Sequence, residues 1–299
     1  MIIQILLQTA FPLLLIIGLW RGKPKSRLEW ALNTLVTGMF IAFIFLSARW
    51  DFISYYLRYF WLIVYLVAVA VSYRALNETA SAGEKNKMQI GGNVLLLGVF
   101  TWLVLSTLLG FAPDQQAVEL QYPLYGQRYY IGGGGASPWL NAHRTDQTAA
   151  NDFALDIVRL NQFGNRAAGI APDELSDYTI YGDTVYSPCT GTVLQAVDSL
   201  PDLIPPEVDY KNIAGNYLII EHGDNIVVLA HLKQGSLLTS AGEIVETGDK
   251  LAQIGNSGYT SQPHLHIHIE QGETLLQGQG VPFKLNGRFL VRNNLFSEP

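Results

Sequence analysis

Four long apolar stretches occupy the first 112 residues and restrict this part of the chain to one kind of structure. They cover approximately residues 2–20, 31–48, 55–73 and 90–111. Each is close to the ~20 residues that cross a ~30 Å hydrocarbon layer as a helix. The sequence therefore predicts a membrane-spanning α-helical bundle of four spans over 1–112. The first stretch has no basic segment before it and three spans after it, so it is interpreted as a retained helix rather than a signal peptide.

Basic residues gather in two of the three loops between these stretches and predict the orientation of the bundle. The first loop carries Arg21, Lys23, Lys25 and Arg27, and the third carries Arg74, Lys85 and Lys87. The second loop has only Arg49 and Arg58. Loops rich in Lys and Arg stay in the cytoplasm, so both termini and everything after residue 112 are expected outside it. No stretch has an acidic residue near its middle, which argues against a transporter.

The rest of the chain has the composition of an acidic soluble domain. From residue 113 onward there are ten Lys/Arg against 21 Asp/Glu. This excess of negative charge repels phosphate backbones, so nucleic acid is not expected as a partner. Cys189 is the only cysteine, which excludes an intrachain disulfide and a cysteine metal cluster. Its setting in a turn that leads into a strand indicates a small packing residue.

Short runs rich in Val, Ile and Tyr alternate with Gly, Pro, Asp and Asn over residues 131–299 and predict β-strands. The expected strands are 191–197, 217–221, 226–232, 245–248, 251–255 and 264–270. The second and third flank His-Gly-Asp-Asn and predict a hairpin, and the next two are expected to pair with each other. The domain is predicted to be an antiparallel all-β sandwich or barrel. Residues 113–130 are a stalk, a linker or an opening strand, and the glycine run 132–135 is expected to be a flexible or close-approach loop near the cleft.

All six histidines lie in this second half, and three of them alternate along one predicted strand. In Pro-His264-Leu-His266-Ile-His268-Ile the three imidazoles share one face and the apolar residues share the other. Packing does not explain such a stripe. Neighbouring members are ~6.6 Å apart along the strand and the outer two are ~13 Å apart. Two adjacent histidines can therefore bind one ion, and one of the outer pair is a bystander.

A catalytic zinc site needs about three protein ligands and an open position for water. Histidine nitrogens with one carboxylate suit zinc better than calcium or magnesium. The best carboxylate is Asp156, which lies in an otherwise apolar stretch where an unpaired charge would be costly. Asp152 is interpreted as a turn residue. His222 is placed at the tip of the predicted hairpin, far from His231, and is expected at the surface.

Four segments together resemble the lysostaphin-type (LytM-like) zinc metalloendopeptidases, in the order in which that family has them. They are Phe-Ala-Leu-Asp156-Ile, Leu-Ala-His231-Leu, Ile-Gly-Asn-Ser-Gly258 and Pro-His264-Leu-His266. The resemblance covers about residues 131–299. It implies the β-fold of that family, a bound Zn²⁺, and cleavage of peptide cross-links in bacterial cell-wall peptidoglycan. Together with the four predicted spans and the loop charges, it indicates a multi-pass protein of the bacterial inner (cytoplasmic) membrane, with a peptidase domain on the extracytoplasmic side.

The resemblance assigns a role to each residue of the site. Asp156 and His266 match metal ligands, and His143 is the candidate for the first histidine ligand. His231 and His264 match two histidines that assist catalysis without binding the metal. Family members commonly place the first histidine a few residues before the aspartate, whereas His143 precedes Asp156 by thirteen. His268 has no counterpart in the motif and is expected to support the site or the fold.

Three other interpretations accompany this one. A non-catalytic relative could bind wall peptides, sense the state of the wall or regulate a partner hydrolase. A biotinyl- or lipoyl-type carrier domain would display Lys250, but it leaves the histidines unexplained. A membrane signalling protease commonly carries His-Glu-x-x-His, which is absent. The expected substrate is a wall peptide or another protein, and loops such as 132–142 and 161–180 are expected to select it. The four spans are expected to contact membrane lipid and offer a surface for a protein partner.

Overall fold

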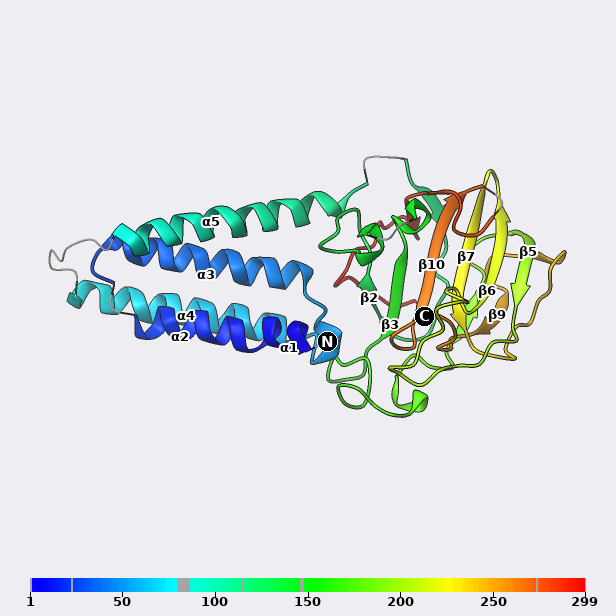
Figure 1. Ribbon diagram of the computed structural model, residues 1–299, viewed down its shortest axis with the longest axis horizontal. Coiled ribbons are helices and arrows are strands. Elements are labelled where there is room, and N and C mark those ends of the chain that lie inside the picture. The colour runs from blue at the N-terminus through cyan, green and yellow to red at the C-terminus, as the bar shows by residue number, and fades with distance from the viewer. Residues whose placement is uncertain are drawn as a thin grey trace. The chain divides into compact units, whose positions relative to one another are not determined.

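The computed structural model describes residues 2–22, 24–79, 87–113, 116–145, 148–272 and 274–298. Two compact units make up the chain, Met1–Leu108 and Leu109–Pro299, and Figure 1 shows their elements. Lys23 and Lys85, which contribute to the predicted orientation, lie outside the described residues.

The first unit is helical. Its helices are α1 (Ile2–Gln8), α2 (Ala10–Arg21), α3 (Arg27–Ser47), α4 (Leu57–Thr79) and α5 (Lys87–Leu108), with a short 3₁₀ turn η1 (Trp50–Phe52). Over the described residues, four helical segments are long and apolar enough to cross a membrane: Ile3–Arg21, Arg27–Ser47, Leu57–Arg74 and Lys87–Phe111. The predicted number of long apolar helices is confirmed.

The first span is interrupted at Thr9, between α1 and α2, for a reason that the sequence contains. Pro12 has no backbone N–H and cannot donate to the carbonyl of Gln8, four residues earlier. The indole Nε1 of Trp61 on α4 donates to that carbonyl instead, at 2.7 Å. Both Gln8 and Trp61 are buried. A side chain of another helix thus satisfies a backbone group that the proline leaves open.

The second unit is built on one large antiparallel sheet. Its strand order is β13–β2–β3–β10–β7–β6–β5–β8, with β11 paired to β10, and Figure 1 shows β2, β3, β10, β7, β6 and β5 side by side. The strands are β2 (Tyr129–Gly133), β3 (Leu155–Arg159), β5 (Gly191–Val197), β6 (Asn216–His222), β7 (Asn225–Leu232), β8 (Ile244–Val245), β10 (Leu265–Gln271), β11 (Gln279–Gly280) and β13 (Leu295–Phe296). Two small sheets pair β1 (Val118–Leu120) with β12 (Phe283–Leu285) and β4 (Thr184–Tyr186) with β9 (Lys250–Gln253). The antiparallel β-fold is confirmed, with β1 and β12 as a parallel exception.

The large sheet has two different faces because its strands alternate. Side chains such as Ile157, Leu229 and Ile267 point into the main apolar core, which the two small sheets also line. On the opposite face the central strands carry Asp156, His266 and His268. Packing therefore fixes which face each site residue occupies, because a register slip of one residue would bury the wrong set.

Two sequence-based expectations can be compared directly with the strand pairing. The hairpin is confirmed, since β6 ends at His222 and β7 begins at Asn225. The expected pairing of 245–248 with 251–255 is wrong: β8 pairs with β5, and β9 pairs with β4. Between them Gly248 has φ +93° and the Asp249 carboxylate accepts from the backbone N–H of Glu246. This turn sends the two strands to different partners.

The segment 113–130, for which the sequence allowed a stalk, a linker or an opening strand, contributes to the second unit. Val118–Leu120 forms β1, and Leu120, Tyr122 and Leu124 are buried in the main core. These packed side chains favour the opening strand.

Candidate metal centre

Asp156 lies at the centre of the site, in the middle of the large sheet. On β3 it is flanked by Leu155 and Ile157, which are buried on the opposite face. Its partner on β10 is His266, and its partner on β2 is Gly133. A β-bulge between Ile131 and Gly133 brings the glycine so close that an added Cβ would lie 2.7 Å from Oδ2 of Asp156. The absence of a side chain at Gly133 therefore makes room for the carboxylate; the close approach agrees with the expectation, but Gly133 lies on β2 and not in a loop.

His266 is placed beside Asp156 by strand pairing. Its Nδ1 lies 3.1 Å from Oδ1 of Asp156. On the other side of the ring, Nε2 lies 3.0 Å from Nδ1 of His268, two residues along the same strand. His268 in turn has its Nε2 3.4 Å from Oε1 of Glu270. The stripe seen in the sequence is therefore a continuous buried row of polar side chains.

His143 reaches the carboxylate from a 3₁₀ turn, η3 (Ala142–Thr145). Its Nε2 lies 3.1 Å from both oxygens of Asp156. The turn is held by Asn141, whose side-chain oxygen accepts from the backbone N–H of His143 and whose amide donates to the carbonyls of Asp152 and Ala154. Asn141 is fully buried. This amide connects the turn to the segment that leads into β3, so the thirteen-residue spacing still brings His143 to Asp156.

His231 is aimed at the same site by a second backbone irregularity. It sits in a bulge at the end of β7, where Asn216 pairs with Leu232 but Tyr217 pairs with Ala230. Its φ is +62°, an uncommon value for a residue other than glycine. The ring Nδ1 donates to the carbonyl of Ser257 at 2.9 Å. This bond makes Nδ1 the protonated nitrogen and leaves the lone pair on Nε2.

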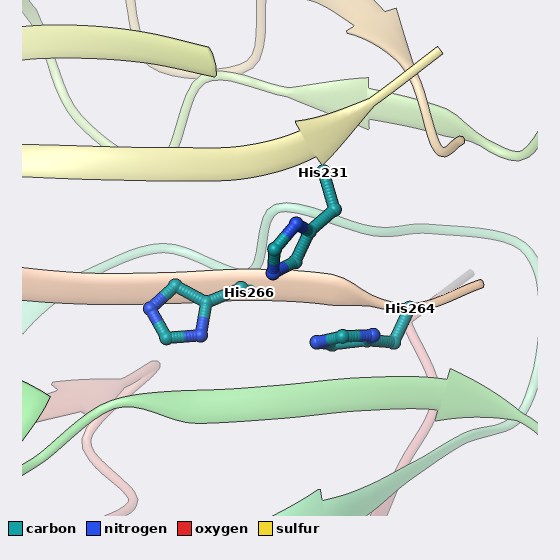
Figure 2. Close-up of side chains that lie close together, drawn as sticks. All are labelled: His231, His264 and His266. Carbon is teal, nitrogen blue, oxygen red and sulfur yellow. The ribbon is translucent and has the colours of Figure 1, made fainter. Parts of the chain in front are cut away.

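His264 precedes β10 and approaches from the other side. Its Nδ1 donates to the carbonyl of Gln262 at 2.8 Å, and its Nε2 lies 3.4 Å from Oδ1 of Asp156. The rings of His231 and His264 have centroids 4.8 Å apart. Figure 2 shows the rings of His231, His264 and His266 converging from β7 and from the start of β10.

Burial and mutual proximity shift the pKa values of these groups. Burial raises the pKa of Asp156, but His143 and His264 outweigh it and hold that pKa well below its usual value. Burial, reinforced by His264 and His266, holds the pKa of His231 well below 6.5. Burial also lowers the pKa of His266 to about 3, although the neighbouring Asp156 carboxylate opposes this. The site therefore presents one carboxylate and at least two neutral imidazoles.

Two sets of three donor atoms lie close enough together to hold a metal ion. One set is His143, Asp156 and His266, and the other is His231, His264 and His266; within each, the atoms lie within 4.8 Å of one another. The first set offers two imidazole nitrogens and one carboxylate oxygen, a donor set that zinc accepts with a fourth position left for water. The residues present therefore fit a zinc ion.

The structure brings together all five residues that the sequence singled out. His222 lies apart from them, with its Nδ1 3.3 Å from the carbonyl of Thr190. His268 contacts His266 on the side of the ring that faces away from Asp156. Sequence reasoning missed Asn141 and Glu270. Glu270 carried a signal, because it continues the alternation of the stripe, whereas nothing in the sequence distinguished Asn141.

A cleft of about 420 Å³ lies over the site. All five residues line it. Its remaining walls are mainly apolar and aromatic and include Val208, Tyr210, Ile213, Tyr259, Leu275 and Leu276. Tyr210 and Tyr259 are largely exposed and have ring centroids 5.2 Å apart. Such a cleft can hold an extended peptide against the metal centre.

The fold and the site define a β-sheet domain with a His/Asp metal centre in an open cleft. Residues 177–278 match Peptidase family M23. The matched segment belongs to this family, which is of the lysostaphin/LytM type. His231, His264 and His266 lie inside the matched residues, and His143 and Asp156 lie before them.

Several curated relatives resemble parts of the chain. Peptidoglycan DD-endopeptidase ShyA of Vibrio cholerae is 36% identical over 145 residues, which are 48% of this chain and 30% of that protein. Peptidoglycan DD-endopeptidase ShyB of the same species is 38% identical over 56 residues (19% and 13%). Endolysin 2638A of Staphylococcus phage 2638A is 35% identical over 63 residues (21% and 13%). The chain thus spans less than a third of each of these relatives.

Solved structures show a weaker likeness. A zinc-containing peptidase from Vibrio cholerae has 22% identity and a TM-score of 0.33, with 56% of this chain and 39% of that chain covered. Lysostaphin has 18% identity and a TM-score of 0.28, with 43% and 40% covered. These scores add nothing to the family assignment, which rests on the sequence matches.

Proposed function

We propose that this protein is a zinc-dependent endopeptidase that hydrolyses peptide cross-links of bacterial cell-wall peptidoglycan. The observation that carries the proposal is the convergence of His143, Asp156 and His266 in an open cleft, with His231 and His264 beside them. Relatives that are themselves named peptidoglycan DD-endopeptidases support the choice of substrate.

In this proposal His143, Asp156 and His266 hold the ion. Zinc held by these residues would act as a Lewis acid and would lower the pKa of a water toward ~7. His231 supplies a neutral ring with its lone pair on Nε2, because Nδ1 donates to the carbonyl of Ser257. It therefore accepts the proton of the attacking water. His264, whose Nδ1 donates to the carbonyl of Gln262, presents its Nε2 to the site and orients the attacking water from the other side.

We also propose a location and a set of partners. Four helices suited to a membrane, with basic first and third loops, support a location in the bacterial inner membrane with the catalytic domain on the extracytoplasmic side. This side is where peptidoglycan lies. Four spans give more surface than an anchor requires, so the helices are proposed to contact a protein partner as well as lipid.

Defined cross-linked peptides test the reaction itself. The full chain in detergent micelles, supplied with zinc, is incubated with cross-linked muropeptides, and the products are identified by mass spectrometry. We expect one peptide bond to be cut by the unchanged chain and by His222→Ala, whose residue lies outside the site. His266→Ala should give no product above background. A folded chain that binds zinc and cuts neither muropeptides nor other peptides would instead favour the non-catalytic alternative.

The division between ligands and helpers has its own test. We expect His264→Ala to retain zinc but to lower the hydrolysis rate by about 10²-fold or more, the usual contribution of a positioned acid or base. His266→Ala should lose both zinc and activity, because it removes one of three ligands. Metal content after gel filtration and turnover are measured on the same samples. Loss of zinc from His264→Ala would contradict the proposed roles.

A further inference from the structure

Beyond the five residues of the proposed site, the structure shows a buried row of contacts that leads away from the metal centre. It runs from Asp156 through His266 and His268 to Glu270, with distances of 3.1, 3.0 and 3.4 Å between the facing nitrogen and oxygen atoms of successive side chains. His268 and Glu270 are 2% and 0% exposed. Neither has a place in the family motif or in the proposed reaction, and buried ionisable side chains are costly unless they are paired.

Glu270 determines the direction of every hydrogen bond in the row. Its Oε1 accepts from the backbone N–H of Leu276 at 2.7 Å, and its Oε2 accepts from that of Gly278 at 2.8 Å. A carboxylate held by two backbone N–H groups presents only lone pairs to its other neighbours. The Nε2 of His268, which faces Oε1, must therefore carry a hydrogen and donate it.

The positions of the ring hydrogens of His268 and His266 follow from this hydrogen bond. A buried imidazole beside another imidazole favours the neutral form, so His268 with a hydrogen on Nε2 has its lone pair on Nδ1. That lone pair faces Nε2 of His266. His266 consequently donates from Nε2 and keeps its own lone pair on Nδ1, the nitrogen that faces Asp156 and belongs to the donor set.

We propose that His268 and Glu270 are a positioning pair that holds His266 in the tautomer and ring orientation needed to bind zinc through Nδ1. The proposal rests on the proposed function, because it assigns a task only if His266 is a ligand. Histidine ligands commonly donate their second nitrogen to a carboxylate or carbonyl, and loss of that partner lowers metal affinity by 10–100-fold. Here the ring of His268 lies between His266 and the carboxylate, so Glu270 acts on His266 through His268.

The same pair connects the metal centre to the wall of the cleft. Leu276, whose backbone N–H is bound by Glu270, also lines the cleft together with Leu275. One carboxylate therefore fixes both the proton pattern of His266 and a short segment that a substrate would touch. Removal of the pair is expected to affect zinc binding directly and substrate binding through this segment.

Zinc affinity, measured by competition with a chelator on the full chain in micelles, tests the proposal. We expect His268→Leu to raise the zinc Kd by 10–100-fold and to change the visible absorption spectrum of the Co²⁺-substituted protein. His268→Gln can accept from His266 and donate to Glu270 with one amide, so its Kd should stay within about threefold of the unchanged chain. If His268→Leu does not fold, His268→Asn replaces it, because the shorter amide cannot reach both neighbours.

Val228→Ala is the matched control. Val228 is fully buried and lies opposite His268 in the β7–β10 pairing, so the change removes packing without removing a hydrogen bond. We expect it to lower the unfolding temperature and to leave the Kd and the Co²⁺ spectrum unchanged. Unchanged values in His268→Leu would overturn the proposal and reduce His268 to a packing residue. Zinc binding that depends on His268 in a chain that cleaves no peptide would uphold the positioning pair and count against the proposed function alone.

Discussion

A histidine can bind a metal only when it is neutral and its lone pair points the right way, and single residues of this site meet both conditions before any ion arrives. Burial keeps the pKa of His266 at about 3 and the pKa of His231 well below its usual value. Carbonyls orient two of the rings, through Ser257 for His231 and Gln262 for His264. The site therefore does not need to lose a proton from His266 when zinc binds near neutral pH.

These depressed pKa values make the metal-free protein sensitive to acid. His231 and His266 take up protons near pH 6.5 only when the chain unfolds, so the unfolded state binds more protons and stability falls as the pH drops below 6.5. At pH 5.5 each of these histidines should lower the free energy of unfolding by about 1.4 kcal/mol relative to its value at high pH. Denaturant unfolding of the metal-free chain between pH 7 and 5 measures this.

His231→Asn provides the control for this prediction. It removes one of the two titrating rings, so the loss of stability between pH 7 and 5 should become smaller by the contribution of one histidine. A free energy of unfolding that stays constant over this range in the unchanged chain would contradict the prediction.

At this scale the sequence predicted much of the site. The alternation around His264, His266 and His268 and the apolar setting of Asp156 were visible without a structure, and all four lie where those patterns indicated. Asn141 could not be found, because a buried amide that braces a loop leaves no periodic signal. The role of Glu270 as a fixed hydrogen-bond acceptor depends on the backbone N–H groups of Leu276 and Gly278. The sequence alone does not show that these groups lie near it.

At the scale of elements, two bulges shape the site. The bulge in β2 brings Gly133 against Asp156, and the bulge at the end of β7 turns His231 toward the metal centre. Bulges re-aim side chains and are common beside active sites. A regular strand would have left His231 on the opposite face from His266, since its neighbour Ala230 is the residue that pairs with His266.

Gly133→Ala tests whether the close approach in β2 matters for the metal. The new Cβ would meet Oδ2 of Asp156 at 2.7 Å, so the carboxylate has to move. We expect the zinc Kd to rise at least tenfold, as measured by chelator competition, while the domain stays folded.

Gly134→Ala is the comparison for this change. Its Cβ would meet side-chain atoms of Leu155 and Ile131 rather than the carboxylate. It should lower the unfolding temperature with a smaller effect on the Kd. Equal effects of the two variants on zinc affinity would contradict the role given to Gly133.

Strands were easier to predict than their partners. The range 191–197 and the Gly-Asp hairpin coincide with β5 and with the β6–β7 turn, because local alternation and turn chemistry specify both. The pairing of β8 and β9 could not be predicted in the same way. Both strands are short, and their partners, β5 and β4, precede them by about fifty residues and more than sixty residues of sequence.

At the scale of the whole molecule, the apolar stretches predicted the four helices because a span needs only length and hydropathy. The interruption at Thr9 was not predicted, although Pro12 signals it; only the hydrogen bond from Trp61, which satisfies the carbonyl of Gln8, joins distant parts of the sequence. The orientation of the helices stays a prediction from loop charge.

Cysteine labelling in intact spheroplasts tests that orientation. Ser54→Cys lies in the second loop and should react with a membrane-impermeant maleimide, whereas Lys25→Cys in the first loop should react only after the membrane is permeabilised. Background should be low because Cys189 is buried and burial raises the pKa of its thiol to about 12. The reverse pattern would place the catalytic domain in the cytoplasm and contradict the proposed location.

The pairing of β3 with β10 has a consequence for how the protein acquires its ion. Asp156 and His266 face each other because of backbone hydrogen bonds in the middle of a packed sheet, whereas small zinc modules bring their ligands together only when the ion folds them. Metallation is therefore expected to follow folding. A chelator should abolish activity reversibly without unfolding the protein. Under the proposed function, the supply of zinc would then govern when the wall is cut.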